Sequence, residues 1–487
     1  MNASPTLLAR RSVMPRNIHH LPHHFHPRRI YSASLPTISS LLSSRCISSS
    51  SSSQSNTSDS ATPATTTASN PIPATFFRGG TSKGIFLNRK HLPSDQSQWA
   101  PIFRGIMGSP DPFNRQLNGM GGGISSLSKI CVVGPPTDAS PSSLPKSADA
   151  IDATDNVDVE YTFVQVGVKD GVIDISGNCG NLTTAIGIFA LDEGICRVPS
   201  AAKGEGNATV KLWNTNTGKT IRTTFPINPA TGLADLDKPE TSMAGVPGEA
   251  SKIRLEFLEP AGAKTGKLLP TGRARDVVKL KAGNGKIQQL KISCVDATNP
   301  TVFLTLSKLN AILSCRGHPT LPNRPDEFLK ASFPDYVLEL LEDIRQQAAV
   351  LMDLDPNTQA QPKITVFQPN DNGTSEYDLA VKTLSMGILH KAIPSTVALC
   401  YAAAVGVKGS VVNQAFECIV NRGGSDMSGE PKQDRIEKNG CGEKLTLELG
   451  IPGGIVEIQG RFKKDGGVKS VAMNRTARRL MTGNVFW

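Results

Sequence analysis

Cys179 lies on a turn between a strand-like and a helix-like segment, in the stretch DISGNCGNLTTAIGIFAL (residues 174–191). The free N–H groups and the dipole at the start of a helix stabilise a thiolate. A papain-type nucleophile needs a histidine base, but beyond the N-terminal leader the sequence has only His91, His318 and His390, none in a recognisable protease motif. A thiol that transfers a proton needs only a partner acid or base. The alternative is a small buried cysteine without chemistry.

Lys129 is the candidate partner of this thiol. It ends the glycine- and serine-rich stretch GMGGGISSLSK (119–129) and precedes the apolar run Ile130–Val133, so we expect it at the start of a buried strand. A desolvated lysine can serve as a base near neutral pH. A surface lysine is the alternative interpretation.

Three clusters combine glycine with Ser, Thr, Lys or Asn: FFRGGTSKGIF (76–86), NGMGGGISSLSKI (118–130) and GNCGN (177–181). Glycine lets the backbone approach a ligand, and consecutive exposed N–H groups bind anions. The clusters therefore indicate carboxylate or phosphate cradles. The sequence has no P-loop, no dinucleotide-binding GxGxxG after a strand and no GxSxG nucleophile elbow, so nucleotide-binding and serine-hydrolase classes are unsupported.

The N-terminal leader is basic. The first acidic residue is Asp59, and six arginines precede it without a lysine. An arginine- and serine-rich, acid-poor leader is typical of a mitochondrial transit peptide. We therefore expect a mitochondrial protein, with a cytoplasmic one as the alternative. A disordered tail without an address remains open, and a nucleic-acid-binding arm is disfavoured because no aromatic residues alternate with the arginines.

Length and composition fit a soluble protein of two or three domains. The chain has 487 residues, 38% of them hydrophobic, and no apolar run approaches the ~18 residues that span a bilayer. Its nine cysteines form no CxxC pair, which argues against a disulfide framework or a zinc site. We expect no membrane, nucleic-acid or metal partner.

The order of predicted elements repeats. Strands at 158–167 and 171–176 precede a glycine-rich turn and a helix at 181–194. Strands at 363–369 and 376–385 precede a loop, Pro394 and an apolar helix. A helical stretch at 326–354 is interrupted by Pro334. Sequence identity between the halves is low, yet the repeat predicts two similar α+β domains that hold a small molecule between them.

Several motifs together resemble the 2-methylaconitate isomerase family, also called PrpF, from about residue 76 to the C-terminus. They are RGGTSKG (78–84), GSPDPF (108–113), GMGGGISSLSK (119–129), SGNCGNL (176–182), NPTVFL (299–304), LSMGILHKA (384–392) and NRTARRLMTG (474–483). The resemblance implies a diaminopimelate-epimerase-like fold: two pseudo-symmetric α+β domains, each a sheet wrapped around a central helix starting near Asn181 or Ser395. The expected division is a disordered leader (1–71), an N-terminal domain (72–290, completed by a strand from 474–487) and a C-terminal domain (291–473).

The resemblance also implies the site. Diaminopimelate epimerases use two facing cysteines, but here only Cys179 has a match, which agrees with the PrpF branch and its lysine base at Lys129. IPST (393–396) departs from the usual Gly-Thr pair. The expected substrate contacts are Arg78, Ser82, Ser126, Asn178, Gly180, Asn181, Ser385, Met386 and His390.

The implied reaction is a cofactor-independent isomerisation of an unsaturated di- or tricarboxylate such as aconitate or 2-methylaconitate. Lys129 removes a proton, backbone N–H groups stabilise the dienolate, and a proton returns to give a cis-trans or positional isomer. Alternatives are an amino-acid epimerase of the same fold and a non-catalytic carboxylate-binding protein. A homodimer is a further expectation.

Overall fold

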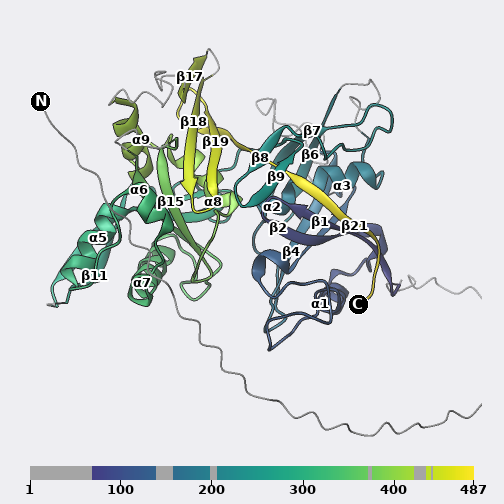
Figure 1. Cartoon of the computed structure of the whole chain (residues 1–487), viewed down its shortest axis with the longest axis horizontal. Coiled ribbons are helices and arrows are strands. Elements are labelled where there is room, and N and C mark those ends of the chain that lie inside the picture. Colours follow the sequence, from purple (N-terminus) through teal and green to yellow (C-terminus); the bar gives the residue numbers. More distant parts are fainter. Residues whose placement is uncertain are drawn as a thin grey trace, which may run out of the picture. The chain divides into compact units, whose positions relative to one another are not determined.

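The alternation of β-branched runs with glycine-rich turns builds a large mixed sheet that packs around two central helices (Figure 1). The computed structural model describes residues 69–138, 157–197, 206–283, 285–370, 376–421, 435–439 and 442–487. The predicted leader, apart from residues 69–71, lies outside these residues. The first strand starts at Ile72.

Successive pairings order sixteen strands across the main sheet. From one edge they are β21 (Ala477–Val485), β1 (Ile72–Gly79), β2 (Ser82–Asn88), β3 (Lys129–Gly134), β4 (Val159–Val166), β6 (Asn207–Asn214), β7 (Lys219–Pro226), β10 (Ile253–Leu258), β20 (Val468–Arg475), β19 (Gly454–Phe462), β18 (Gly442–Ile451), β15 (Leu379–Ser385), β14 (Lys363–Pro369), β13 (Asn299–Thr305), β12 (Ile287–Ala297) and β11 (Asp276–Lys281). Three short strands pair at its margins: β5 (Ile173–Asp174), β16 (Ile388–Leu389) and β17 (Ile436–Asn439).

Two sets of strands repeat one pairing pattern. In the N-terminal set, β1–β2–β3–β4–β6–β7–β10, the successive pairs are antiparallel, parallel, antiparallel, parallel, antiparallel and antiparallel. The C-terminal set, β12–β13–β14–β15–β18–β19–β20, has the same succession. The predicted pseudo-symmetric α+β architecture is therefore confirmed. All described residues belong to one compact unit, Ala64–Trp487. The domain boundaries at 290 and 473 therefore stay predictions.

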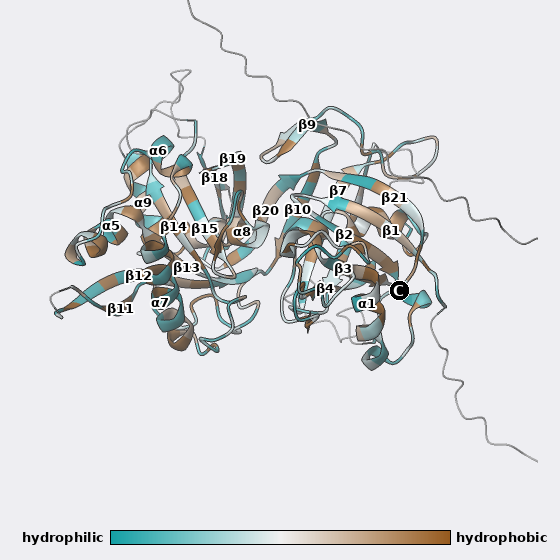
Figure 2. Cartoon of the chain, turned by 60° about the horizontal axis from the view of Figure 1, so that its bottom comes forward, coloured by the Kyte–Doolittle hydropathy of each residue, from teal (hydrophilic) through white to brown (hydrophobic). Residues whose placement is uncertain are grey.

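Each strand set surrounds a central helix that starts where the sequence predicts. The first consists of α2 (Gly180–Thr183) and α3 (Ile186–Asp192). The sequence predicted one continuous helix over 181–194. That continuity is wrong, because a turn at Thr184–Ala185 interrupts the helix. The second, α8 (Ser395–Ala404), is buried along its whole length and contacts β12, β13, β18, β19 and β20, in keeping with its hydrophobic colouring in Figure 2.

Five further α-helices occur among the described residues, and the last of them packs against α8 in the same hydrophobic core. They are α1 (Trp99–Met107), α5 (Leu306–Cys315), α6 (Pro325–Lys330), α7 (Asp335–Leu351) and α9 (Val411–Asn421). As predicted, Pro334 separates α6 from α7, since proline cannot donate a helical hydrogen bond. No helix in the described part of the chain is long and apolar enough to cross a membrane.

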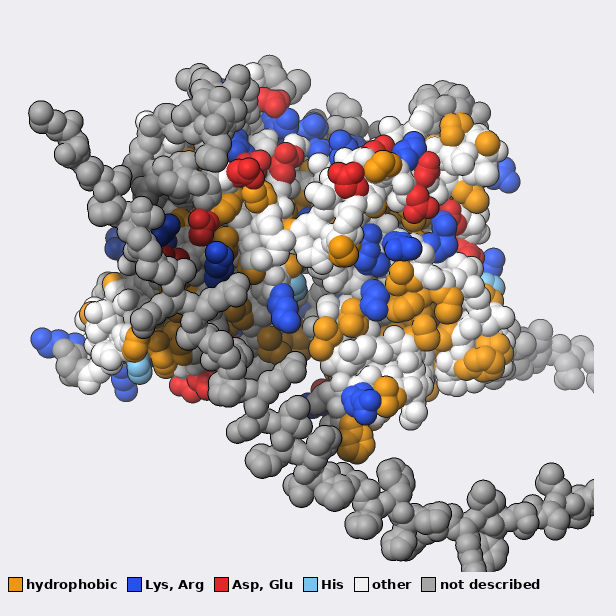
Figure 3. Space-filling model, in the orientation of Figure 1, with side chains coloured by type: hydrophobic (Ala, Val, Ile, Leu, Met, Phe, Trp, Pro, Cys, Tyr) orange, Lys and Arg blue, Asp and Glu red, His pale blue; other side chains and the backbone are white. Residues whose placement is uncertain are grey.

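The C-terminal strand β21 returns to the N-terminal strand set and pairs with its first strand, β1. Its other edge has no partner among the described strands. Figure 3 shows basic side chains gathered over β21, where Arg478 and Arg479 are exposed. Charged side chains on an edge strand disfavour edge-to-edge association with other strands.

Candidate active site

Lys129 begins β3 and is 8% exposed, which confirms its predicted place at the start of a buried strand. Its Nζ donates to Gln165 Oε1 (2.5 Å) and lies 5.0 Å from the centre of the Phe163 ring. Gln165 faces Lys129 in the β3–β4 register and is itself held, because its Nε2 donates to the carbonyls of Ser125 and Ser128. Gln165 therefore positions the lysine, a role that the sequence did not indicate.

Cys179 is the N-cap residue of α2 and is partly exposed. Its Sγ lies 4.0 Å from Oγ of Ser82, a buried residue that begins β2. The carbonyl of Cys179 accepts from the backbone N–H and the hydroxyl of Thr183, which fixes the cap. The sulfur is thus held at the helix start without being enclosed.

Other cysteines in the described part of the chain are poor candidates for proton transfer. Burial raises the pKa of Cys131 and Cys294 well above the usual value, and it raises the pKa of Cys196 and of Cys400 to about 12. Cys315 and Cys418 are exposed and lie on α5 and α9. The environment therefore singles out Cys179.

The starts of the two central helices meet. Ser395 Oγ donates to Asn181 Oδ1 (2.6 Å), and Asn181 Nδ2 donates to Thr81 Oγ1 (3.1 Å). A Cβ on Gly180 would lie 3.0 Å from Ser395 Cβ, so glycine permits this close approach. The sequence predicted both positions, and the structure uses Asn181 to join the two helix starts.

Glycine at position 79 is required by the same packing. A Cβ there would lie 2.5 Å from the carbonyl oxygen of Asn181, a contact that demands backbone movement. We expect Gly79→Ala to lower the free energy of unfolding by about 1–3 kcal/mol, the usual cost of overpacking. Urea denaturation measures this. Gly483→Ala is the matched control, because a Cβ at that β21 position meets nothing within 4 Å; equal losses in both variants would contradict the packing argument.

The C-terminal strand set supplies a second basic cluster. Lys363 begins β14, and its Nζ donates to Ser385 Oγ (3.0 Å) and to the carbonyl of Ala360 (3.1 Å). His390 Nδ1 accepts from the backbone N–H of Ala392 (3.1 Å), which leaves Nε2 as the donor of the neutral ring. Burial chiefly lowers the pKa of His390, and the charges of Lys363 and Lys129 lower it further. Ser385 and His390 were predicted; Lys363 was not.

The other predicted substrate contacts differ in their exposure and in their hydrogen-bond partners. Arg78 Nη1 donates to the carbonyls of Gly80 and Thr476 and to the Thr476 hydroxyl. Asn178 accepts from Tyr161 and Thr183, while its buried Nδ2 has no hydrogen-bond partner among the described residues. Ser126 lies partly exposed in the 3-10 turn Ser125–Leu127, just before Lys129. Met386, at a positive φ of 54°, is 45% exposed on the β15–β16 turn.

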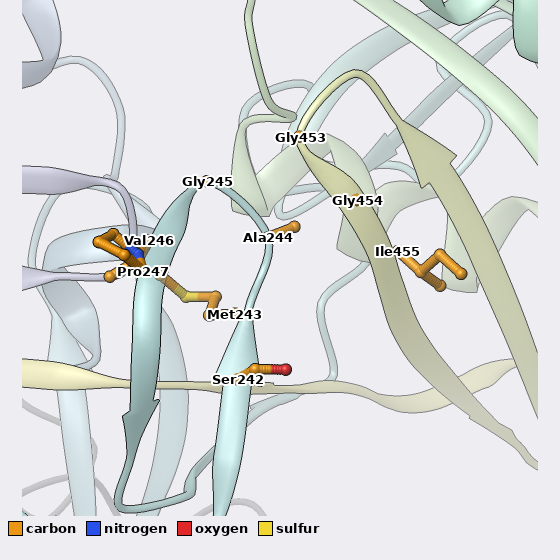
Figure 4. A pocket seen from close by; sticks show the side chains of 9 residues that line it. All are labelled: Ser242, Met243, Ala244, Gly245, Val246, Pro247, Gly453, Gly454 and Ile455. Carbon is orange, nitrogen blue, oxygen red and sulfur yellow. The ribbon is translucent and has the colours of Figure 1, made fainter.

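An open hollow of about 620 Å³ lies between the tip of the hairpin β8 (Thr241–Met243) and β9 (Val246–Ala250) and the turn joining β18 to β19 (Figure 4). It adjoins the candidate site, because a Cβ on Gly245 would contact Thr81 and one on Gly453 would contact the Lys391 carbonyl. Its lining residues include no acid or base: Ser242, Met243, Ala244, Gly245, Val246, Pro247, Gly453, Gly454 and Ile455. The groups that can perform acid–base chemistry are therefore Lys129, Cys179, Lys363 and His390, which lie outside this lining.

No cluster of three or more potential metal ligands occurs in the ranges that the structure describes. These residues can donate hydrogen bonds or exchange protons: Lys129 and Cys179 with Ser82, and Lys363 and His390 with Ser385. Such a set suits an anionic substrate that gains and loses protons.

Comparison with known proteins gives consistent matches. Residues 69–423 match the model of the family described as PrpF protein. A 3-methylitaconate isomerase of Eubacterium barkeri is 30% identical over 432 residues, covering 85% of this chain and 97% of that protein. A 2-methyl-aconitate isomerase of Shewanella oneidensis is 30% identical over 442 residues, covering 85% and 96%. The crystal structure of a methylitaconate-delta-isomerase superposes with a TM-score of 0.61 at 30% identity, covering 86% of this chain and 96% of that one.

Proposed function

From the premise that this chain belongs to the PrpF protein family and is an isomerase, we propose that it isomerises an unsaturated di- or tricarboxylate by moving a proton. The observation that carries the proposal is the placement of Lys129. It is a buried lysine held by Gln165 within the same set of strands that presents Cys179 at a helix start. The names of the relatives favour aconitate-like or itaconate-like acids.

The reaction starts with removal of a proton from a carbon that is both allylic and activated by a carboxylate. Lys129 Nζ accepts this proton, and the electron pair spreads into the carboxylate as a dienolate. We assign the stabilisation of this charge to the N–H groups at the starts of α2 and α8, which meet at the hydrogen bond between Ser395 and Asn181. The thiol of Cys179 donates or accepts a proton on the same allylic system.

Cis-trans and positional isomers share this first deprotonation. After it, rotation about the former double bond and reprotonation at the same carbon gives the cis-trans isomer. Reprotonation at the far end of the allylic system moves the double bond. The proposal therefore covers both outcomes.

An amino-acid epimerase of the same fold is the alternative within enzymes. Such a mechanism with two facing thiols needs a cysteine at the start of the second central helix. The N-cap residue of α8 is Pro394, and Cys400 lies inside the helix, fully buried. The placement of these two residues favours the carboxylate isomerase.

The test is incubation of the purified protein with cis-aconitate, trans-aconitate, 2-methylaconitate and 3-methylitaconate, with the alkene and methyl protons followed by NMR. We expect at least one acid to be converted to an isomer of the same mass. Tight binding of these acids without conversion of any of them would instead support the non-catalytic carboxylate-binding protein.

A further inference from the structure

Lys363 occupies the position in the C-terminal strand set that Lys129 occupies in the N-terminal set. Each lysine is the first residue of the strand that runs parallel to one neighbour and antiparallel to the next: β3 between β2 and β4, and β14 between β13 and β15. The following residues are also alike, KICVV (129–133) and KITVF (363–367). The pseudo-symmetry of the sheet thus relates the two lysines.

The hydrogen bonds of the two lysines follow the same pseudo-symmetry. Lys129 pairs across the sheet with Gln165 and donates to it. Ile364 pairs with Leu384, so the next pair outward is Lys363 and Ser385, and Lys363 donates to Ser385. In both strand sets a neutral polar side chain on the adjacent antiparallel strand holds the ammonium group.

Contacts between the strand sets bring the loop before Cys179 next to the residues before Lys363. A Cβ on Gly177, two residues before Cys179, would lie 3.1 Å from Gln361 Nε2, two residues before Lys363. Asn181 and Ser395 are hydrogen-bonded nearby. Burial is the main cause that lowers the pKa of Lys363, to about 8; the charge of Lys129 lowers it further, and Cys179 and Asp174 act in the opposite sense. Together with the close approach of Gly177 and Gln361, these influences indicate that Lys363 lies near Lys129 and Cys179.

The described residues do not occupy all the donors of Lys363. An ammonium group has three donors, and Lys363 uses two, on Ala360 and Ser385. It forms no ion pair within the described ranges of the chain. Lys382 on the neighbouring strand β15 shows the contrast, because its Nζ donates to the carbonyls of Phe328, Leu329 and Ala331 at the end of α6. All three donors of Lys382 are therefore used, whereas one donor of Lys363 has no partner among the described residues and can bind a ligand.

We propose that Lys363 is a second proton-transfer lysine, which exchanges a proton with the substrate through the thiol of Cys179 while Lys129 exchanges one directly. The inference rests on the proposed isomerase function and specifies its site. It gives the C-terminal strand set an acid–base group although Pro394 occupies the place of a second cysteine.

The proton balance is as follows. Lys129 Nζ forms an N–H bond as the substrate C–H bond breaks, and the electron pair enters the dienolate. At the far end of the allylic system a new C–H bond forms as the S–H bond of Cys179 breaks, and the resulting thiolate takes a proton from the Lys363 ammonium, whose N–H bond breaks. Lys129 is left protonated and Lys363 neutral, and exchange with water resets both. In the reverse reaction the two roles interchange.

Lys363→Arg and Lys363→Gln test the proposal in the full chain, assayed with whichever acid the wild type converts. Arginine keeps the positive charge but does not release a proton in proteins. We expect both variants to lower kcat about 100-fold or more with KM changed less than about threefold, since general acid–base groups contribute at that scale. Deuterium exchange into the substrate in heavy water, started by Lys129, should persist while isomer formation is lost.

Lys391→Arg is the matched control, because Lys391 is exposed next to His390. A Lys363→Arg variant with wild-type kcat, or a Lys363→Gln variant that loses binding and exchange together, would overturn the proposal in favour of a charge that merely holds a carboxylate. A wild-type protein that converts none of the acids would instead refute the proposed function. Thermal melting confirms that each variant is folded.

Discussion

Lys129→Met lowers kcat for isomerisation by about 10²- to 10⁴-fold, the range that general acid–base groups contribute. Methionine matches the apolar stem of lysine and fills the space beside Phe163, so the buried start of β3 should be preserved. The variant lacks the nitrogen that accepts the substrate proton. Because Gln165 loses its partner, the change also removes a hydrogen bond, but Gln165 keeps its two bonds to backbone carbonyls.

Steady-state kinetics and deuterium exchange together measure this loss. Exchange of the substrate proton with heavy water should fall in parallel with turnover, because both start with the same deprotonation. Lys83→Met is the control, since Lys83 lies partly exposed on β2 over the Phe76 ring. If Lys129→Met turns over at the wild-type rate, Lys129 is not the base.

Cys179→Ser lowers kcat by about 100-fold or more. A hydroxyl replaces the thiol with little change in shape, but it is a far weaker acid. The helix start and the bonds from Thr183 to the Cys179 carbonyl do not involve the sulfur, so the fold should be unchanged. The effect therefore isolates the chemistry of the thiol.

Alkylation provides a second readout for Cys179. The partly exposed thiol should react with iodoacetamide, with loss of activity, and a saturated tricarboxylate should slow this reaction. Cys418→Ser is the control for an exposed cysteine on α9. Near-normal kcat in Cys179→Ser would make the thiol a spectator and leave the lysines as the acid–base groups.

Local sequence patterns were sufficient for the elements around Lys129 and Ser395. A glycine-rich turn followed by an apolar run places Lys129 at a buried strand start, and proline followed by an apolar run places the start of α8. Strand β14 coincides with the predicted range 363–369. These features depend on residues that are neighbours in the sequence.

The role of Lys363 could not be read from its surroundings in the chain. No glycine cluster precedes it, and its position follows from the pairing of β14 with β13 and β15 and from the contact of Gln361 with the loop before Cys179. The local pattern of apolar and polar residues does not predict such long-range strand pairing. The similarity of KICVV to KITVF is the signal that would have indicated it.

The predictions about the leader and the assembly do not depend on the described residues. The transit peptide, the mitochondrial location and the homodimer remain proposals, since the leader lies outside the described residues apart from its last three. The helix predicted at 181–194 differs from the structure only in its continuity. The turn at Thr184–Ala185 interrupts it, and the second segment still packs against β3, β4 and β6.

The central claim is that isomerisation proceeds by removal and return of a proton, and the position of deuterium in the product tests it most directly. The wild-type protein is incubated in heavy water with the acid it converts, and both ends of the allylic system are examined by proton and deuterium NMR. The account predicts deuterium at the carbon that gains a proton, and none in substrate incubated with Lys129→Met. Isomer that retains protium at every carbon would contradict it.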